Sequence, residues 1–168
     1  RKDQHILKDF PELNELYQEI IRSSLSYLKS TGYLCDAVVI TDAWLNIGPK
    51  ESILHWHSHG NAFLSGTYYV NFNPSEHSML EFKNDRMDKG QYNRPAISIP
   101  VNKKVNSPYT NPTLRLAVPE GSILIWKSHL IHGYQTPNKM EDRITLSFNV
   151  MPKECTDGQT FSFSVAED

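Results

Sequence analysis

Residues 54–72 read LHWHSHGNAFLSGTYYVNF, and their opening six positions place histidine at every second residue. Side chains two residues apart point to the same face of a β-strand, so His55, His57 and His59 are predicted to project to one side. Neutral imidazoles spaced in this way can converge on one metal ion, since histidine is a common ligand for zinc, iron, copper and nickel. The stretch therefore predicts a strand over 52–59 that carries a candidate metal site, with a polar, solvated strand face as the alternative.

The chain after Gly32 has the same β-rich texture as this stretch. Short segments of Val, Ile, Tyr, Phe and Thr alternate with turn residues such as those at 48–49 and 73–74. Strands are predicted near 37–46, 52–59, 64–72, 79–83, 96–101, 114–117, 122–126, 143–151 and 159–165. Long polar segments at 84–95 and 102–113 are predicted to be binding loops or lids.

Residues 1–33 carry a different pattern, in which apolar residues recur at steps of three and four from Leu13 to Leu28. This spacing predicts a helix with one apolar stripe, packed on the sheet, with Gly32 as its stop. The prediction for 1–168 is a single domain, with a helical lead-in over 1–33 and a β core over 34–168, folded as a sandwich or barrel.

Composition excludes several classes of protein. The chain has 168 residues, of which 39% are hydrophobic and 21% charged, with a net charge of −2. These values exclude a disordered tail and a collagen-like fibre, and no run of about 18 apolar residues is available to cross a membrane. No basic stripe indicates a nucleic-acid partner.

The two cysteines bear on the cellular compartment, and the first residue bears on whether the chain has been trimmed. Cys35 and Cys155 lie far apart and lack the spacing of a zinc knuckle. They favour reduced thiols in the cytoplasm, with one long-range disulfide as the alternative. Because the sequence begins with Arg1 and not with Met, we expect a trimmed chain.

A second polar cluster follows the apolar strand at 122–126, where His129 and His132 occur. A facial metal site takes two ligands from one strand and a third from a distant strand, which leaves positions open for substrates. Beyond these histidines, the strand at 143–151 alternates apolar residues with Arg143, Thr145, Ser147 and Asn149. If this polar face lines a barrel, the guanidinium and the threonine hydroxyl form a clamp for a carboxylate; the alternative is a solvated face.

These blocks, taken in order, resemble the iron(II)- and 2-oxoglutarate-dependent oxygenases. The resemblance is closest to a group from phages and bacteria with an HxHPxxxxSG-like signature, and it covers roughly residues 42–150. It is carried by WLN at 44–46, HSHGNAFLSG at 57–66, PEGSIL at 119–124, SHLIH at 128–132 and RITLSFN at 143–149. In this chain glycine stands at position 60, where the signature has proline.

The resemblance implies a mainly β fold, a double-stranded β-helix of the jelly-roll, cupin-like type, with iron inside the barrel mouth. It implies His57 and His132 as ligands. His59 stands where most of the superfamily carries Asp or Glu, so the third ligand is either His59, which we favour, or a carboxylate such as Glu81 or Asp85.

The same resemblance implies 2-oxoglutarate as cosubstrate. Arg143 would pair with its distal carboxylate, helped by Thr145 and Tyr69, while Asn149 and Asn46 would hold its other end. The implied reaction decarboxylates 2-oxoglutarate to succinate and hydroxylates a small-molecule or peptide substrate.

Two other functions stay open on the sequence alone. A cupin-like three-histidine metalloenzyme would need no 2-oxoglutarate, and a β-sandwich binding module would not be an enzyme. No nucleic-acid or membrane partner is expected, and a homodimer is the commonest assembly for such a chain.

Overall fold

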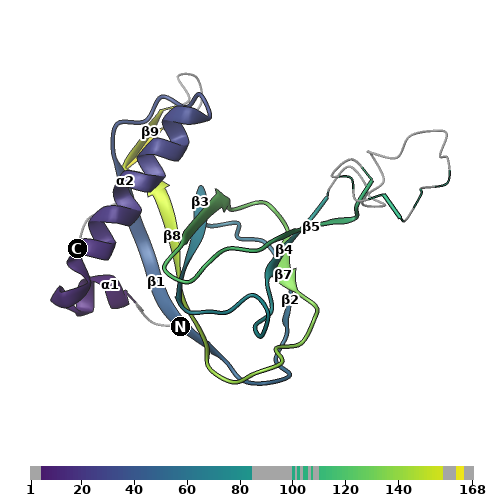
Figure 1. The fold of residues 1–168 in the computed structure, drawn as a ribbon. Coiled ribbons are helices and arrows are strands. Elements are labelled where there is room, and N and C mark those ends of the chain that lie inside the picture. Colours follow the sequence, from purple (N-terminus) through teal and green to yellow (C-terminus); the bar gives the residue numbers. More distant parts are fainter. Residues whose placement is uncertain are drawn as a thin grey trace.

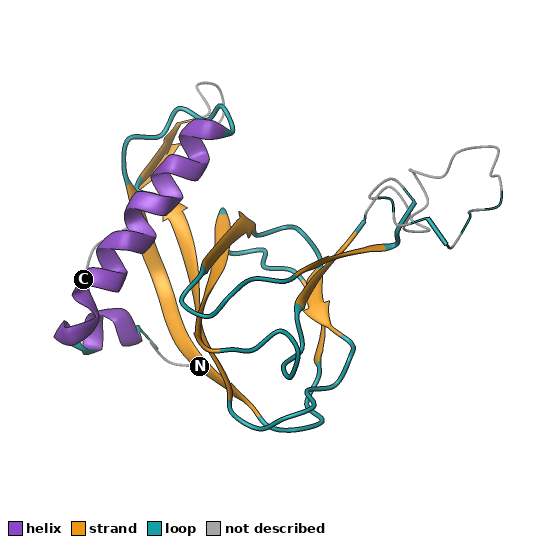
Figure 2. Cartoon of the chain, in the orientation of Figure 1, coloured by secondary structure: helices purple, strands orange, loops and turns teal. Residues whose placement is uncertain are grey.

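The computed structural model is mainly β, with a short helical segment at its N-terminal end (Figures 1 and 2). The residues that it describes are 5–84, 100, 102, 104–105, 107, 110–156 and 162–164. Of the strand predicted at 96–101 only residue 100 is described, and of the two predicted long loops the structure describes Asn84 and residues 102, 104–105, 107 and 110–113.

The N-terminal segment is helical in three pieces, so the prediction of one helix over 1–33 is wrong in its continuity. The pieces are α1 (Ile6–Asp9), the 3-10 turn η1 (Pro11–Leu13) and α2 (Asn14–Ser30). Phe10 is extended, with φ −121° and ψ 101°, because the ring of Pro11 disfavours helical backbone in the residue before it. The apolar stripe does run along α2, as predicted.

The first sheet has four antiparallel strands in the order β1 (Val38–Gly48), β8 (Arg143–Pro152), β3 (Leu64–Asn71) and β6 (Ile123–Lys127). Helix α2 lies along this sheet (Figure 1). Ile20 and Leu28 of the helix are fully buried against the apolar face of the sheet, where Phe148 and Leu64 are also fully buried. The packing of the helix on the sheet is therefore confirmed.

The second sheet lies opposite the first and is also antiparallel. Its order is β2 (Leu54–His57), β7 (His132–Tyr134), β4 (Leu80–Lys83) and β5 (Thr113–Leu116), and a separate pair is formed by β9 (Glu154–Thr156) and β10 (Ser162–Ser164). Two facing four-stranded sheets make the predicted double-stranded β-helix, and that fold class is confirmed. The sequence reading missed β7 and β9.

Strand β8 alternates as its sequence predicts. Leu146, Phe148 and Val150 belong to the core under the helix, whereas Arg143, Thr145 and Asn149 are buried on the opposite face, toward the second sheet. A solvated face is therefore wrong for these polar residues. The space between the sheets is polar because this face of β8 lines it.

Two further sequence expectations meet the structure here. Among the described residues, no helix combines the length and apolar character that crossing a bilayer requires. Cys35 is a free thiol whose Sγ donates to the carbonyl of Ala37, while the side chain of Cys155 lies outside the described residues.

Candidate active site

Three histidine side chains from two strands and a turn meet between the sheets. His57 ends β2 and His132 begins β7, and the two are direct partners in the ladder. His59 lies two residues beyond the end of β2, where its backbone N–H donates to the carbonyl of Ser128 at 2.9 Å. The ring centroids of His57 and His132 are 4.3 Å apart, and that of His59 is 5.2 Å from each.

The three rings present a matched set of ligand atoms, all within 4.8 Å of one another. The Nδ1 atoms of His57 and His132 each lie 2.8 Å from the backbone carbonyl two residues earlier in the chain. The Nδ1 atom of His59 lies 2.7 Å from Oδ1 of Asn149. A carbonyl oxygen only accepts, so each Nδ1 carries the proton and each Nε2 keeps its lone pair. Metal-binding histidines are oriented in this way.

The surroundings of His132 keep it uncharged. The side chain is buried, and the rings of Trp126 and Phe82 lie 4.9 Å and 6.0 Å from it. Burial lowers the pKa of His132 to about 4, because the charged imidazolium loses its hydration. The ring is therefore neutral at physiological pH, which is the form that binds a metal ion.

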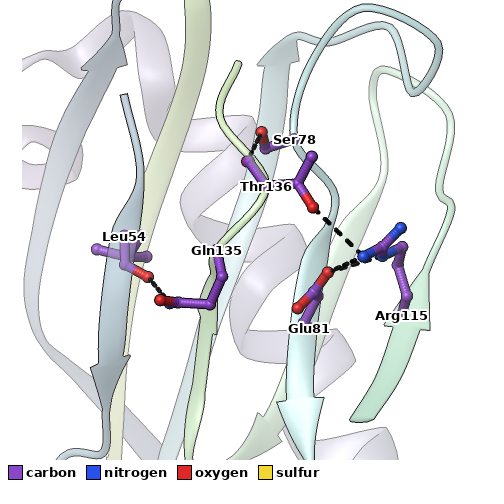
Figure 3. Close-up of polar contacts among 6 residues, drawn as sticks. All are labelled: Leu54, Ser78, Glu81, Arg115, Gln135 and Thr136. Atoms are coloured by element: carbon purple, nitrogen blue, oxygen red, sulfur yellow. Dashed lines mark hydrogen bonds and ion pairs between the residues drawn. The ribbon is translucent and has the colours of Figure 1, made fainter. Parts of the chain in front are cut away.

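The geometry favours His59 over the carboxylate considered as the alternative third ligand. Glu81 on β4 is buried, but its carboxylate is ion-paired with Arg115, which also reaches Thr136 (Figure 3). Among the described residues, Glu81 does not belong to the group of possible metal ligands that the three histidines form. Asp85 lies outside the described residues. The side chain of His55, which the alternation placed on the same face as the other two, is exposed and does not join the cluster.

A cavity of about 450 Å³ opens over the cluster between the two sheets. The three histidines line it together with Arg143, Thr145 and Asn149 from β8. Four of the candidate site residues thus come from sequence positions more than 70 residues away from His57 and His59, and the antiparallel pairing of the sheets brings them to one place.

Arg143 is the cation of this cavity and is only 4% exposed. Its Nε donates to the carbonyl of Ser78 at 3.0 Å, Nη1 lies 3.4 Å from the hydroxyl of Thr145, and the ring of Tyr134 is 4.7 Å from Cζ. Within the described residues it has no carboxylate partner. Burial lowers the pKa of Arg143, because the guanidinium loses its hydration. A buried cation without a counter-ion costs free energy, which an anionic ligand in the cavity would recover.

Tyr69 and Asn149 were predicted to touch the cosubstrate, and those roles stay predictions. Tyr69 is fully buried near Arg143, with 5.9 Å between its ring and Cζ, and its hydroxyl has no partner in the described part of the chain. Burial raises the pKa of Tyr69 to about 12, so the hydroxyl keeps its proton and is available as a neutral hydrogen-bond donor. The amide oxygen of Asn149 faces Nδ1 of His59, and its Nδ2 donates to Asp42; its second amide hydrogen has no acceptor among the described residues.

Two buried serines were missed as site residues by the sequence reading. Ser65 lies 2.9 Å from Nδ1 of His59 and 2.9 Å from the hydroxyl of Ser128, and both serines are 1% exposed. Alternation along β3 places Ser65 on the cavity face, which was the available signal. Ser128 lies in a turn, where no periodicity marks it.

Comparison with known proteins adds a family and a solved structure. A family described as "Putative 2OG-Fe(II) oxygenase" matches residues 42–149, more than half of the chain. A solved structure, that of apo HygX from Streptomyces hygroscopicus, is similar with 13% identity and a TM-score of 0.47. The match covers 68% of this chain and 58% of the HygX chain. The search of curated proteins finds no match.

Proposed function

Because the chain belongs to the 2OG-Fe(II) oxygenase family, we propose that it is an Fe(II)- and 2-oxoglutarate-dependent dioxygenase that hydroxylates its substrate. The observation that carries this proposal is the meeting, in one cavity, of three correctly oriented imidazoles and a buried guanidinium that lacks a counter-ion.

The metal site fits ferrous iron on its donor chemistry. His57, His59 and His132 would hold the ion through Nε2, and imidazole is a donor that suits iron. When bound, iron and 2-oxoglutarate supply the oxidising power, with decarboxylation of the cosubstrate to succinate. With these three residues as its protein ligands, a bound ion would still have room in the cavity for the cosubstrate.

The cosubstrate site fits a dicarboxylate. Arg143 would bind the distal carboxylate of 2-oxoglutarate by donating hydrogen bonds from the N–H groups that do not bond to Ser78. Thr145 and Tyr69 would each add a neutral hydroxyl donor. Asn149 would offer its second amide hydrogen to the other end of the molecule. The role of these residues is to fix one orientation of 2-oxoglutarate, since a bound geometry close to the reacting one lowers the barrier.

The prime substrate would enter the same cavity, as a small molecule or as a side chain of a peptide. Residues of the two sheets line the cavity, so a bound substrate would exclude water from the atoms that react. Segments 84–95 and 102–113 are proposed to shape substrate choice; most of the first and part of the second lie outside the described residues.

The test is an anaerobic titration of the purified protein with Fe(II) and then 2-oxoglutarate. The proposal expects a visible charge-transfer band when both are present, and succinate formation once air is admitted. The matched variant Arg143→Met should still bind iron and should lose the band at the same 2-oxoglutarate concentration. A wild-type protein that binds iron but gives neither band nor succinate, with the variant unchanged, would instead indicate a cupin-like three-histidine enzyme.

A further inference from the structure

We propose that Asp42 acts through Asn149 as a positioning pair that fixes the tautomer of His59, and so makes it the third metal ligand. This inference rests on the proposed function, and it deepens the account of His59, which stands where most of the oxygenase superfamily carries Asp or Glu.

The three residues form one chain of hydrogen bonds across β1 and β8. Asp42 and Asn149 are direct partners in the ladder between these strands. Nδ2 of Asn149 donates to Oδ1 of Asp42 at 2.9 Å, and Oδ1 of Asn149 lies 2.7 Å from Nδ1 of His59. The second oxygen of Asp42 accepts from the hydroxyl of Thr41 at 2.7 Å, which holds the carboxylate in place.

The direction of each bond in this chain follows from the carboxylate. An ionised carboxylate can only accept, so the amide must turn its NH₂ group to Asp42 and its oxygen to His59. That oxygen can only accept in turn, so Nδ1 of His59 must carry the proton. The lone pair is then on Nε2, the atom that faces the other two imidazoles. Asp42 thus determines the protonation of a ring that it does not touch.

A buried serine makes the dependence on Asn149 sharper. The hydroxyl of Ser65 donates to Oδ1 of Asn149 at 2.8 Å and lies 2.9 Å from Nδ1 of His59. With the amide oxygen present, the hydroxyl hydrogen is committed to Asn149. Without it, the same hydroxyl can donate to Nδ1, which would move the ring proton to Nε2 and block the ligand atom.

His59 differs in this respect from the other two ligands. His57 and His132 are oriented by backbone carbonyls two residues away, which no side-chain substitution removes. The orientation of His59 depends on side chains from β1, β3 and β8. Through Asn149, the negative charge of Asp42 also lies behind His59, the imidazole that stands where most of the superfamily has a carboxylate.

The test measures the tautomer first, in metal-free protein, by two-bond ¹H–¹⁵N NMR correlation of the imidazoles. The signals of His59 are identified by their loss in His59→Gln. The wild type should show only the Nδ1–H form of His59. Asn149→Leu should show the Nε2–H form, and the isosteric Asp42→Asn, whose amide can face either way, should show a mixture. Asn71→Leu removes an exposed asparagine of β3 that lies outside the cavity and donates to the carbonyl of Asp142, and it should leave His59 unchanged.

The second readout is Co(II) affinity, followed by the visible spectrum of the bound ion. Loss of an outer partner of a metal ligand typically weakens binding by about 10- to 100-fold, which we expect for Asn149→Leu. Asp42→Asn should weaken Co(II) binding less than Asn149→Leu does, and Asn71→Leu should bind Co(II) as the wild type does.

The two proposals fail in different ways. A His59 that keeps the Nδ1–H form in both Asp42→Asn and Asn149→Leu would overturn the positioning role, even if the wild type bound iron and turned over 2-oxoglutarate. Because Asp42→Asn preserves size and shape, it keeps the test available should Asn149→Leu not fold. A wild type that shows the expected tautomers but has no turnover would overturn the proposed function and leave the positioning role in place.

Discussion

Replacing Arg143 with methionine separates ligand binding from stability. In the ligand-free protein the guanidinium is 4% exposed and has no counter-ion among the described residues. Methionine keeps the apolar packing against the ring of Tyr134 and removes the cost of burying a charge, but it leaves the carbonyl of Ser78 without its donor. These effects oppose each other, so we expect a change in the free energy of unfolding within about 1 kcal/mol, or about 2–4 °C in Tm.

The effect on 2-oxoglutarate should be far larger. Removing one partner of a buried, hydrogen-bonded charge pair costs about 2–5 kcal/mol, since the other charge is left unpaired in the site. At about 1.4 kcal/mol for each factor of ten, the Kd for 2-oxoglutarate should rise roughly 30-fold to 4,000-fold.

Two measurements on the Mn(II)-loaded protein check both sides of this prediction. Isothermal titration calorimetry gives the Kd for 2-oxoglutarate, and thermal unfolding without ligand gives Tm. The control is Arg22→Met, which removes an exposed arginine of α2 paired with Glu19 and should change neither quantity appreciably. An Arg143→Met protein that binds 2-oxoglutarate as tightly as the wild type would refute the reasoning about the unpaired cation.

Three further variants test other parts of the account. Tyr69→Phe removes a buried hydroxyl that has no partner, so Tm at pH 7 should not fall, while 2-oxoglutarate binding should weaken by about 1 kcal/mol if the hydroxyl donates to it. Because burial raises the pKa of Tyr69 to about 12 from 10, the wild type should lose stability relative to this variant as the pH rises from about 10 to about 12. Gly133→Ala places a Cβ 2.6 Å from the carbonyl oxygen of Leu54, so it should push β2 away from β7 and weaken Co(II) binding. In the control Gly60→Ala the added Cβ meets nothing within 4 Å, so Co(II) binding should be unchanged. Equal Co(II) affinities of the two variants would contradict the claim that the pairing of β2 with β7 positions the histidines. Elemental analysis of Glu81→Gln should still find one metal ion per chain. Loss of the ion would support Glu81, and not His59, as the third ligand.

Much of the fold was predictable because its signals are local. Strict alternation on β8 separates the core residues from Arg143, Thr145 and Asn149, and the structure keeps that separation. The resemblance to a known family implied His57 and His132 as ligands and left the third between His59, which we favoured, and a carboxylate; the structure brings His59 together with the other two. The break at Phe10 was also local, since Pro11 disfavours helical backbone in the residue before it and the apolar period begins only at Leu13.

The parts that sequence reasoning missed depend on pairings between distant strands. β7 has only three residues, one of them glycine, so it carries no readable period, although it positions His132. The contact between Asp42 and Asn149 joins residues 107 positions apart and exists only in the register of β1 with β8. The sequence predicted one strand that carries both His57 and His59, but β2 ends at His57. His59 reaches the cluster from the segment after β2, which is held by the hydrogen bond from its backbone N–H to the carbonyl of Ser128.

The central claim is that one iron ion is held by imidazoles from β2, from the segment just after it and from β7, with the guanidinium of β8 binding the cosubstrate. A crystal structure of the protein prepared without oxygen, with Fe(II) and 2-oxoglutarate, tests it most directly. The account predicts iron bonded to Nε2 of His57, His59 and His132, and a carboxylate of 2-oxoglutarate on Arg143. Iron bound elsewhere, or bound with any of the three rings turned away, would contradict it.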